Sequence, residues 1–178
     1  MFNEIIEAVL NDDFEKLESF IKQGGNLNEV SEKENWNLLH MALLSVTNPA
    51  SSKMIKYLES HDVSVNLVDS YGNTPLHYAS RSKHVELMEI LLNAGCEIDH
   101  ENNDGFTPLR LTIMSKPYNP GALELLLSHG ANAEHSPAGG VTVKNYAEII
   151  LHGEDKFMLE LFDKYIREDD GSNGGRLD

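Results

Sequence analysis

Apolar residues recur at helical spacing along most of this chain. Val85, Met88, Leu91 and Leu92 fall on one side of a predicted helix, and Gly95 follows as the residue that ends it. The same spacing marks both ends of the chain, with Ile5, Ile6, Val9 and Leu10 near the N-terminus and Phe157, Met158, Leu161, Phe162, Tyr165 and Ile166 near the C-terminus. A pair of such helices cannot bury its apolar face alone, so the pattern predicts several pairs stacked on one another.

The chain also repeats itself. A Gly-x-Thr-Pro-Leu run begins at Gly72 and again at Gly105, 33 residues later, and each run is followed by a helical segment, a Leu-Leu pair and a glycine. Weaker copies precede and follow these two. Aligning all copies places one small residue of each in register, at steps of 34, 37, 33 and 35: Ala8, Ala42, Ala79, Thr112 and Ala147.

These motifs resemble the ankyrin repeat, and the resemblance covers about residues 1–166. It implies an all-α solenoid in which each repeat is a pair of antiparallel helices and a β-turn or hairpin finger joins successive repeats. The expected repeats span about residues 1–30, 31–67, 68–100, 101–135 and 136–166. Residues 167–178 are polar and rich in glycine, so we expect a flexible tail there.

Local signals agree with this organisation. Thr74 and Thr107 are predicted helix N-caps, each followed by a proline at the first helical position, where the missing N–H costs nothing. Ala79 is expected to face inward and to let neighbouring helices approach closely. The second and fourth repeats are longer, with about four extra residues around 46–49 and two around 116–120, both in the turn between paired helices. Such insertions mark a binding face or are surface-loop variation.

The charge balance restricts the partners. The chain has 178 residues, 14 of them Lys or Arg against 29 Asp or Glu, for a net charge of −15. Phosphate backbones and anionic membrane surfaces are repelled by such a chain, so we expect neither nucleic-acid nor membrane binding. A basic protein is the electrostatic complement, although the charge also serves solubility.

The single cysteine, Cys96, excludes an intramolecular disulfide and fits a reducing compartment. The N-terminus turns acidic at Glu4 and lacks a signal peptide's basic start and apolar run, and no apolar stretch approaches the ~20 residues needed to span a bilayer. We therefore expect a cytoplasmic protein, and a monomer.

The eight histidines raise the question of a metal or catalytic site. His40 and His77 occupy a slot in which the ankyrin resemblance implies a structural, hydrogen-bonding histidine. No two histidines show the i, i+4 spacing of a zinc-binding His-Glu-x-x-His motif, and Cys96 has no cysteine partner. The chain carries no nucleophile elbow, phosphate loop or dinucleotide fingerprint. We expect no enzymatic activity and no cofactor.

The variable positions of the ankyrin family carry over by register and predict the partner-binding residues. They are Lys33, Glu34, Trp36 and Ser45 in the second repeat, Ser70, Tyr71, Asn73 and Arg81 in the third, and Asn103, Asp104, Phe106 and Met114 in the fourth. Trp36, Tyr71 and Phe106 form an aromatic row with polar neighbours, which is typical of binding hot spots. Trp36, the only tryptophan and a finger residue, is predicted to contribute most to binding. The alternative is that these rings pack on adjacent fingers; Tyr71 is the one most expected to face solvent.

Two kinds of function fit these features. The first is a binding module that inhibits a basic protein, as small immunity proteins and ankyrin inhibitors of kinases do. The second is an adaptor or host-directed effector that recruits a partner without inhibiting it. An enzyme and a purely structural scaffold have less support, because no catalytic constellation is present and the predicted hot spots favour a partner.

Overall fold

The structure, a computed structural model, describes residues 2–45, 49–138, 140–151 and 155–171. In this part of the chain, short α-helices follow one another and no β-strand is present. In chain order they are α1 (Phe2–Leu10), α2 (Phe14–Lys22), α3 (Leu38–Leu43), α4 (Ser52–Ser60), α5 (Pro75–Ser82), α6 (Val85–Asn93), α7 (Pro108–Ile113), α8 (Pro120–Ser128), α9 (Val143–Leu151) and α10 (Lys156–Gly171). The predicted all-α solenoid is confirmed.

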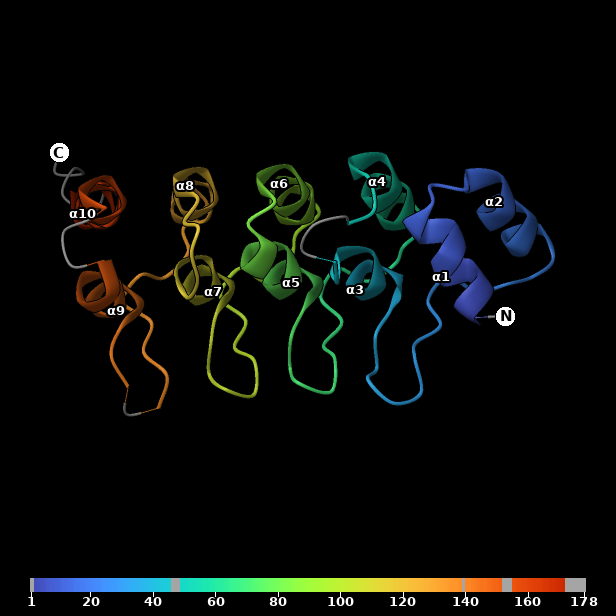
Figure 1. Cartoon of the computed structure of the whole chain (residues 1–178), viewed down its shortest axis with the longest axis horizontal. Helices are drawn as coiled ribbons and strands as arrows, with labels where there is room; N and C mark the ends of the chain where they lie inside the picture. The colour runs from blue at the N-terminus through green and yellow to red at the C-terminus, as the bar shows by residue number, and fades with distance from the viewer. Residues whose placement is uncertain (1, 46–48, 139, 152–154, 172–178) are drawn as a thin grey trace, which may run out of the picture.

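The helices form two layers along one axis (Figure 1). The inner layer holds α1, α3, α5, α7 and α9, the outer layer holds α2, α4, α6, α8 and α10, and the first and last helix pairs lie at opposite ends of the stack. Long loops, the fingers, project from the inner layer between successive pairs. Contacts run within each pair and between neighbouring pairs, so each pair is stabilised by the next.

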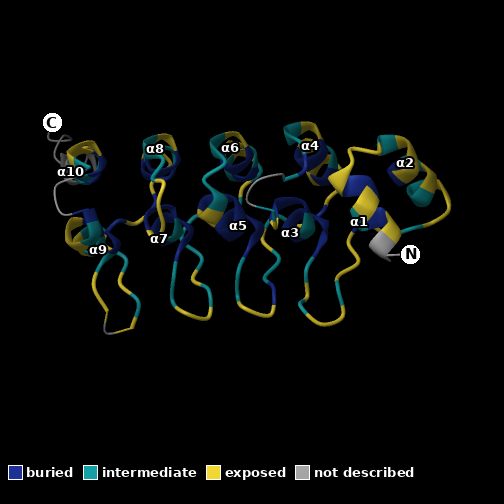
Figure 2. Cartoon of the chain, in the orientation of Figure 1, coloured by how far each residue is buried: buried dark blue, intermediate teal, exposed yellow. Residues whose placement is uncertain are grey.

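Small residues let the inner helices pack closely. The row of small residues predicted from the sequence repeat, which we call the small row, is buried throughout: Ala8, Ala42, Ala79, Thr112 and Ala147. Large apolar side chains such as Leu76 and Leu109 fill the space between the layers and are fully buried. Burial is therefore concentrated where the layers meet, and the finger tips and outer helix surfaces are exposed (Figure 2).

The predicted helix boundaries are confirmed. Thr74 and Thr107 are the N-cap residues of α5 and α7, and a proline follows each. Gly95 follows α6 with a φ of 79°, the left-handed conformation that glycine adopts without strain.

Two features differ from the sequence-based prediction. Helix α10 continues to Gly171, four residues past the predicted start of the tail at residue 167, because the intervening residues are polar but include no helix breaker. Leu10 and Phe157, predicted on apolar helix faces, are instead exposed, since each lies on the side of its helix that no neighbour covers. Residues 46–48 of the first insertion lie outside the described residues.

Candidate functional site

Each finger is a tight loop closed by backbone hydrogen bonds. In the three fingers that precede α3, α5 and α7, a backbone N–H donates to a carbonyl four or five residues later: Ser31 to Trp36, Asp69 to Asn73, and Asn102 to Phe106, at 2.8–3.0 Å. Adjacent fingers are also joined near their tips, by Ser70 N–H to Glu34 O at 2.8 Å and by Asn103 N–H to Tyr71 O at 3.0 Å. The fingers therefore form one connected surface.

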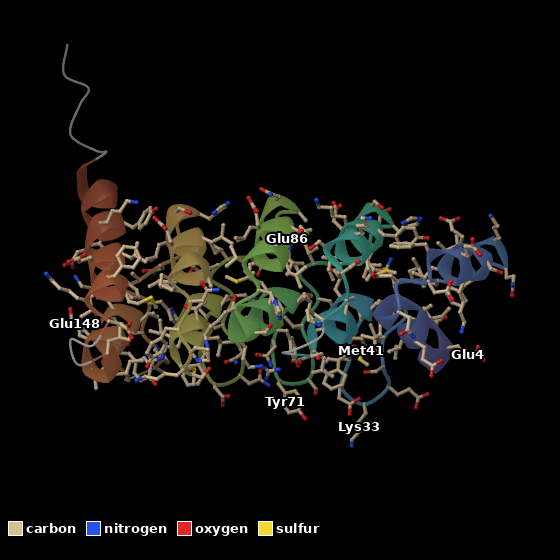
Figure 3. The ribbon with its side chains drawn as sticks, turned by 45° about the horizontal axis from the view of Figure 1, so that its top comes forward. Glu4, Lys33, Met41, Tyr71, Glu86 and Glu148 are labelled. Atoms are coloured by element: carbon tan, nitrogen blue, oxygen red, sulfur yellow. The ribbon has the colours of Figure 1, made fainter. Side chains whose placement is uncertain are left out.

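The fingers, the inner helices and the residues directly after these helices carry the predicted site residues, and Ser45 lies two residues past the end of α3. We call the side of the inner helices that is turned away from the outer layer the inner face. Lys33, Ser70, Tyr71, Arg81, Asn103, Asp104 and Met114 are exposed, whereas Glu34, Trp36, Ser45, Asn73 and Phe106 are half-buried. Figure 3 shows Lys33 and Tyr71 at the finger tips, below Met41 of α3, with Glu86 at the opposite side on the outer layer.

Trp36 uses its polar edge inside the protein. Its indole N–H donates to Asp69 Oδ2 at 3.1 Å and to Tyr78 Oη at 3.2 Å. Asp69 is buried, and its carboxylate also accepts hydrogen bonds from the Tyr78 hydroxyl and from the backbone N–H groups of Tyr71 and Asn73. Trp36 thus ties its finger to the next repeat, and only the remaining ring surface is available to a partner.

Asp69 and Tyr78 are functional neighbours that the sequence analysis missed. Burial raises the pKa of the Asp69 carboxyl, but hydrogen bonds from Tyr78, Asn73 and Trp36 outweigh that effect and leave the pKa below its ordinary value. Burial and the contact with Asp69 raise the pKa of Tyr78 to about 12. The available signal was an Asp two residues before Tyr71, the spacing at which an Asx side chain accepts a hydrogen bond from the backbone of its own turn.

Phe106 is held in a similar way. Its carbonyl accepts a hydrogen bond from His77 Nε2 at 3.0 Å, and the guanidinium carbon of Arg110 lies 5.5 Å from the ring centre. Arg110 is itself buried and lies 3.5 Å from the ring centre of Tyr146. The Phe106 ring is half-buried, so part of it packs within the protein, as the alternative predicted, and part of it is exposed.

Tyr71 presents its ring to solvent, as expected, with 59% of its surface exposed. Its backbone is held by Asp69 and by Asn103, so the ring projects from a fixed loop. A large aromatic side chain on an ordered backbone loses little conformational entropy when it is covered, which makes Tyr71, rather than Trp36, the strongest candidate anchor of the three aromatic residues.

One predicted position needs correction. Seven residues after the N-caps Thr74 and Thr107 lie Arg81 and Met114, and seven after Asn37, the N-cap of α3, lies Leu44 rather than Ser45. Because the extra residues of the second repeat follow α3, the register has to be counted forward from the N-cap. Leu44 is therefore the exposed inner-face residue of this repeat, while Ser45 is half-buried.

The two histidines in the repeated slot have the structural role that the family resemblance implied. The backbone N–H groups of Asn37 and Thr74 donate to Nδ1 of His40 and His77, at 3.3 and 3.1 Å. Each ring then donates from Nε2 to a carbonyl of the following finger, Asn73 O or Phe106 O, at 3.0 Å. Burial lowers both pKa values, that of His77 to about 4. Neutral rings therefore link each inner helix to the next finger.

The loops that join the two helices of a repeat, at the end away from the fingers, also differ between repeats. The insertion before α8 contacts the third repeat, where Lys83 Nζ donates to Ser115 O at 2.6 Å and Asn119 Nδ2 donates to Lys83 O at 3.1 Å. Asn119 and Lys83 line a shallow depression of about 360 Å³, together with residues from Pro49 to Ser52 and from His84 to Leu87. The insertion thus joins two repeats, and its part in binding stays a prediction.

A metal site, a nucleophilic thiol and a membrane-spanning helix find little support in the described residues. They contain no group of three or more His, Cys, Asp or Glu side chains that could hold a metal ion. Cys96 is half-buried, and burial raises the pKa of its thiol to about 12, far from the thiolate that nucleophilic chemistry requires. None of the described helices is long and apolar enough to cross a membrane.

Comparison with known proteins agrees with the geometry. The family model for ankyrin repeats (3 copies) matches residues 5–102 and 53–136. An ankyrin repeat protein of Acanthamoeba polyphaga mimivirus is 28% identical over 148 residues, covering 83% of this chain and 18% of the viral protein. The tyrosine-protein kinase Shark of Drosophila melanogaster is 33% identical over 82 residues, covering 46% of this chain and 8% of the kinase.

This chain thus spans less than a fifth of either relative, and what those whole proteins do does not carry over to it. The matched residues nevertheless include the second to fourth repeats, with their fingers, capping prolines and buried histidines. The chain belongs to the ankyrin-repeat family, whose repeats are protein–protein interaction modules.

Proposed function

We propose that this chain acts by binding, not by catalysis, and that it inhibits a basic protein in the cytoplasm, as a monomer. The fingers and the inner face form the binding surface. The observation that carries the proposal is the net charge of −15: even if every Lys and Arg is neutralised by an acidic side chain, 15 acidic residues remain.

The ion pairs among the described residues support the argument from net charge. Lys144 pairs with Asp163 at 3.0 Å and Lys164 with Glu124 at 3.2 Å, both toward the C-terminal end of the stack. The fingers, in contrast, expose the acidic side chains of Glu32 and Asp104 as well as the ring of Tyr71. A basic partner is drawn to such a surface over long range, which speeds association and makes the complex sensitive to salt.

The size and connectivity of the surface support inhibition. Fingers joined to one another by backbone hydrogen bonds and backed by two helical layers lose little freedom on binding. A partner that is covered by several repeats at once can no longer present the covered groups to its own substrate or target. An adaptor would use the same surface but leave the partner's active groups free.

A pull-down from a lysate of the cells that produce this protein tests the proposal. The wild type is immobilised beside a Tyr71→Ala/Asp104→Ala variant, which alters exposed finger residues, and a Glu86→Ala/Glu89→Ala control, which removes two exposed charges from α6. We expect a basic protein to be held by the wild type and the control, released by rising salt, and lost by the finger variant.

The activity of the captured protein then separates the two binding roles. Added chain is expected to suppress that activity in proportion to complex formed. Unchanged activity in a saturated complex would favour the adaptor. Equal retention by all three proteins, or capture of no basic protein, would contradict the proposed function.

A further inference from the structure

One position of the inner helices is exposed in every repeat. It lies seven residues after the N-caps of α3, α5 and α7, seven after Thr142 at the start of α9, and two after the small buried Ala8 in α1. Its occupants, which we call the outward row, are Leu10, Leu44, Arg81, Met114 and Ile149.

The apolar members of the outward row are not part of the core. Between 36% and 53% of the surface of each side chain is exposed. The small row, two residues earlier on the same helices, is buried and already fills the layer behind them. Three residues earlier on the same helix faces lie Met41, Leu111 and Tyr146, all half-buried. In α3, α7 and α9 the inner face therefore offers an apolar band two side chains wide. Exposed apolar surface gathered on one face in this way marks an interaction site.

Arg81 interrupts this band at its centre. Its guanidinium carbon lies 4.9 Å from the ring centre of Tyr78, and no described acidic side chain lies within ion-pair distance of it. Tyr78 in turn donates to the buried Asp69. The stacking fixes the direction of the Arg81 side chain but leaves its outer N–H groups for a carboxylate from outside.

The distance between successive residues of the outward row favours one backbone conformation of the bound segment. Packed helices lie about 8–10 Å apart, and residues seven apart in an α-helix are separated by about 10.5 Å on the same face. An extended strand covers that distance in three residues, which point to alternate faces. A polyproline segment, at about 3.1 Å per residue, repeats near this distance but presents one side chain per turn and leaves the second row of the band uncovered.

We infer that the outward row is the docking site for an amphipathic α-helix of the partner. That helix lies along the inner face, carries apolar side chains seven residues apart, and has a carboxylate opposite Arg81. Its polar side is basic, because the fingers carry the acidic residues Glu34 and Asp104 and because the exposed Glu7 lies three residues before Leu10 in α1. The inference rests on the proposed function, since it names the part of the partner that the inner face recognises.

Synthetic peptides of about 28 residues, long enough to reach across the stack as a helix, provide the probe. The first has leucines at heptad spacing, lysines on the other side and one central Glu at a heptad position. The second has Lys in place of that Glu, and the third has the composition of the first in an order without an apolar stripe. Dissociation constants are measured by fluorescence anisotropy for the wild type and for Arg81→Glu, Leu44→Ser/Met114→Ser and Phe157→Ser.

We expect the wild type to bind the first peptide at least tenfold more tightly than the second, and Arg81→Glu to reverse that preference. Leu44→Ser/Met114→Ser should weaken binding at least tenfold. Phe157→Ser, which removes an even more exposed apolar side chain from α10, should leave it unchanged. All substituted residues are exposed, and circular dichroism and thermal unfolding confirm that the variants fold.

Three results would overturn the inference: the third peptide binding as tightly as the first, an unchanged preference in Arg81→Glu, or no binding of any peptide. A basic protein captured by the pull-down while the peptides fail would leave the proposed function standing without this docking site. Peptide binding with the expected reversal, but no basic partner in the lysate, would reject the function and retain the site.

Discussion

At the residue scale, a small set of polar side chains joins each finger to the repeat beside it. Asp69 and Asn102 occupy equivalent finger positions, and the side chain of each accepts hydrogen bonds from backbone N–H groups two and four residues later. Only Asp69 also faces Trp36 and Tyr78, which both donate to it. The turn itself needs one acceptor oxygen, so an asparagine suffices at 102, whereas two further donors at 69 require a carboxylate.

Asp69→Asn is therefore expected to destabilise the protein by about 1–3 kcal/mol, because the amide NH₂ would face hydrogen-bond donors in a buried site. Urea unfolding measures the change. Asp104→Asn, at an exposed finger tip, serves as the matched control and should change stability by less than about 0.5 kcal/mol. Equal effects of the two substitutions would contradict this account of the finger.

The buried histidines predict a pH dependence. Burial lowers the pKa of His77 from 6.5 to about 4, so between these pH values the unfolded chain binds a proton that the folded chain does not. Stability therefore falls as the pH falls from 6.5 toward 4, by about 3 kcal/mol for this group. Urea unfolding across this range checks it, and the slope should be shallower in His77→Gln. An identical slope in both proteins would show that His77 does not titrate in this way.

At the element scale, the stack depends on how closely the inner helices approach. Gly72 shows how close the neighbouring fingers lie: its φ is 76°, and a Cβ added there would lie 2.8 Å from the backbone nitrogen of Asn103. Ala79 is fully buried in α5, whose inner-layer neighbours are α3 and α7. Because Ala79 is fully buried between neighbouring helices, we expect little room for larger side chains in the small row.

Ala79→Leu is expected to destabilise the protein by about 1–3 kcal/mol through overpacking. Thermal or urea unfolding measures it. Arg81→Leu introduces the same side chain two residues later, at an exposed position, and should be close to neutral. A neutral Ala79→Leu would mean that the inner helices can separate without cost.

At the scale of the whole molecule, stability is shared between neighbouring repeats. Leu91 in α6 and Leu161 in α10 are both buried in the layer interface, but α6 has outer-layer neighbours on two sides and α10 on one. In a stack of this kind, the cost of a substitution spreads through an internal repeat and stays local in a terminal one.

Leu91→Ala is therefore expected to lower the stability of the whole stack by about 2–5 kcal/mol in one transition. Leu161→Ala should instead release the last repeat early. Trp36, the single tryptophan, reports on the second repeat, while circular dichroism reports on all helices. The dichroism midpoint should precede the fluorescence midpoint in urea for Leu161→Ala alone; coincident midpoints in both variants would show a fully cooperative array.

The sequence by itself determined the repeat architecture, because that architecture depends on local and periodic signals. Capping threonines and prolines, the glycine after α6 and the small row at one position per repeat all act within a few residues or recur at a fixed step. The same periodicity located the fingers and therefore most of the candidate site. It also singled out Tyr71, whose exposure needs only a place at a finger tip.

Only the tertiary structure decided how those site residues are used. Trp36 and Phe106 are drawn partly inward by Asp69, Tyr78, His77 and Arg110, and these contacts join residues 29 to 42 positions apart or depend on side-chain direction. The outward row became visible only once the helix starts fixed the register, which replaced Ser45 by Leu44. Periodicity places a residue on a face, but what that residue touches depends on the neighbouring repeat.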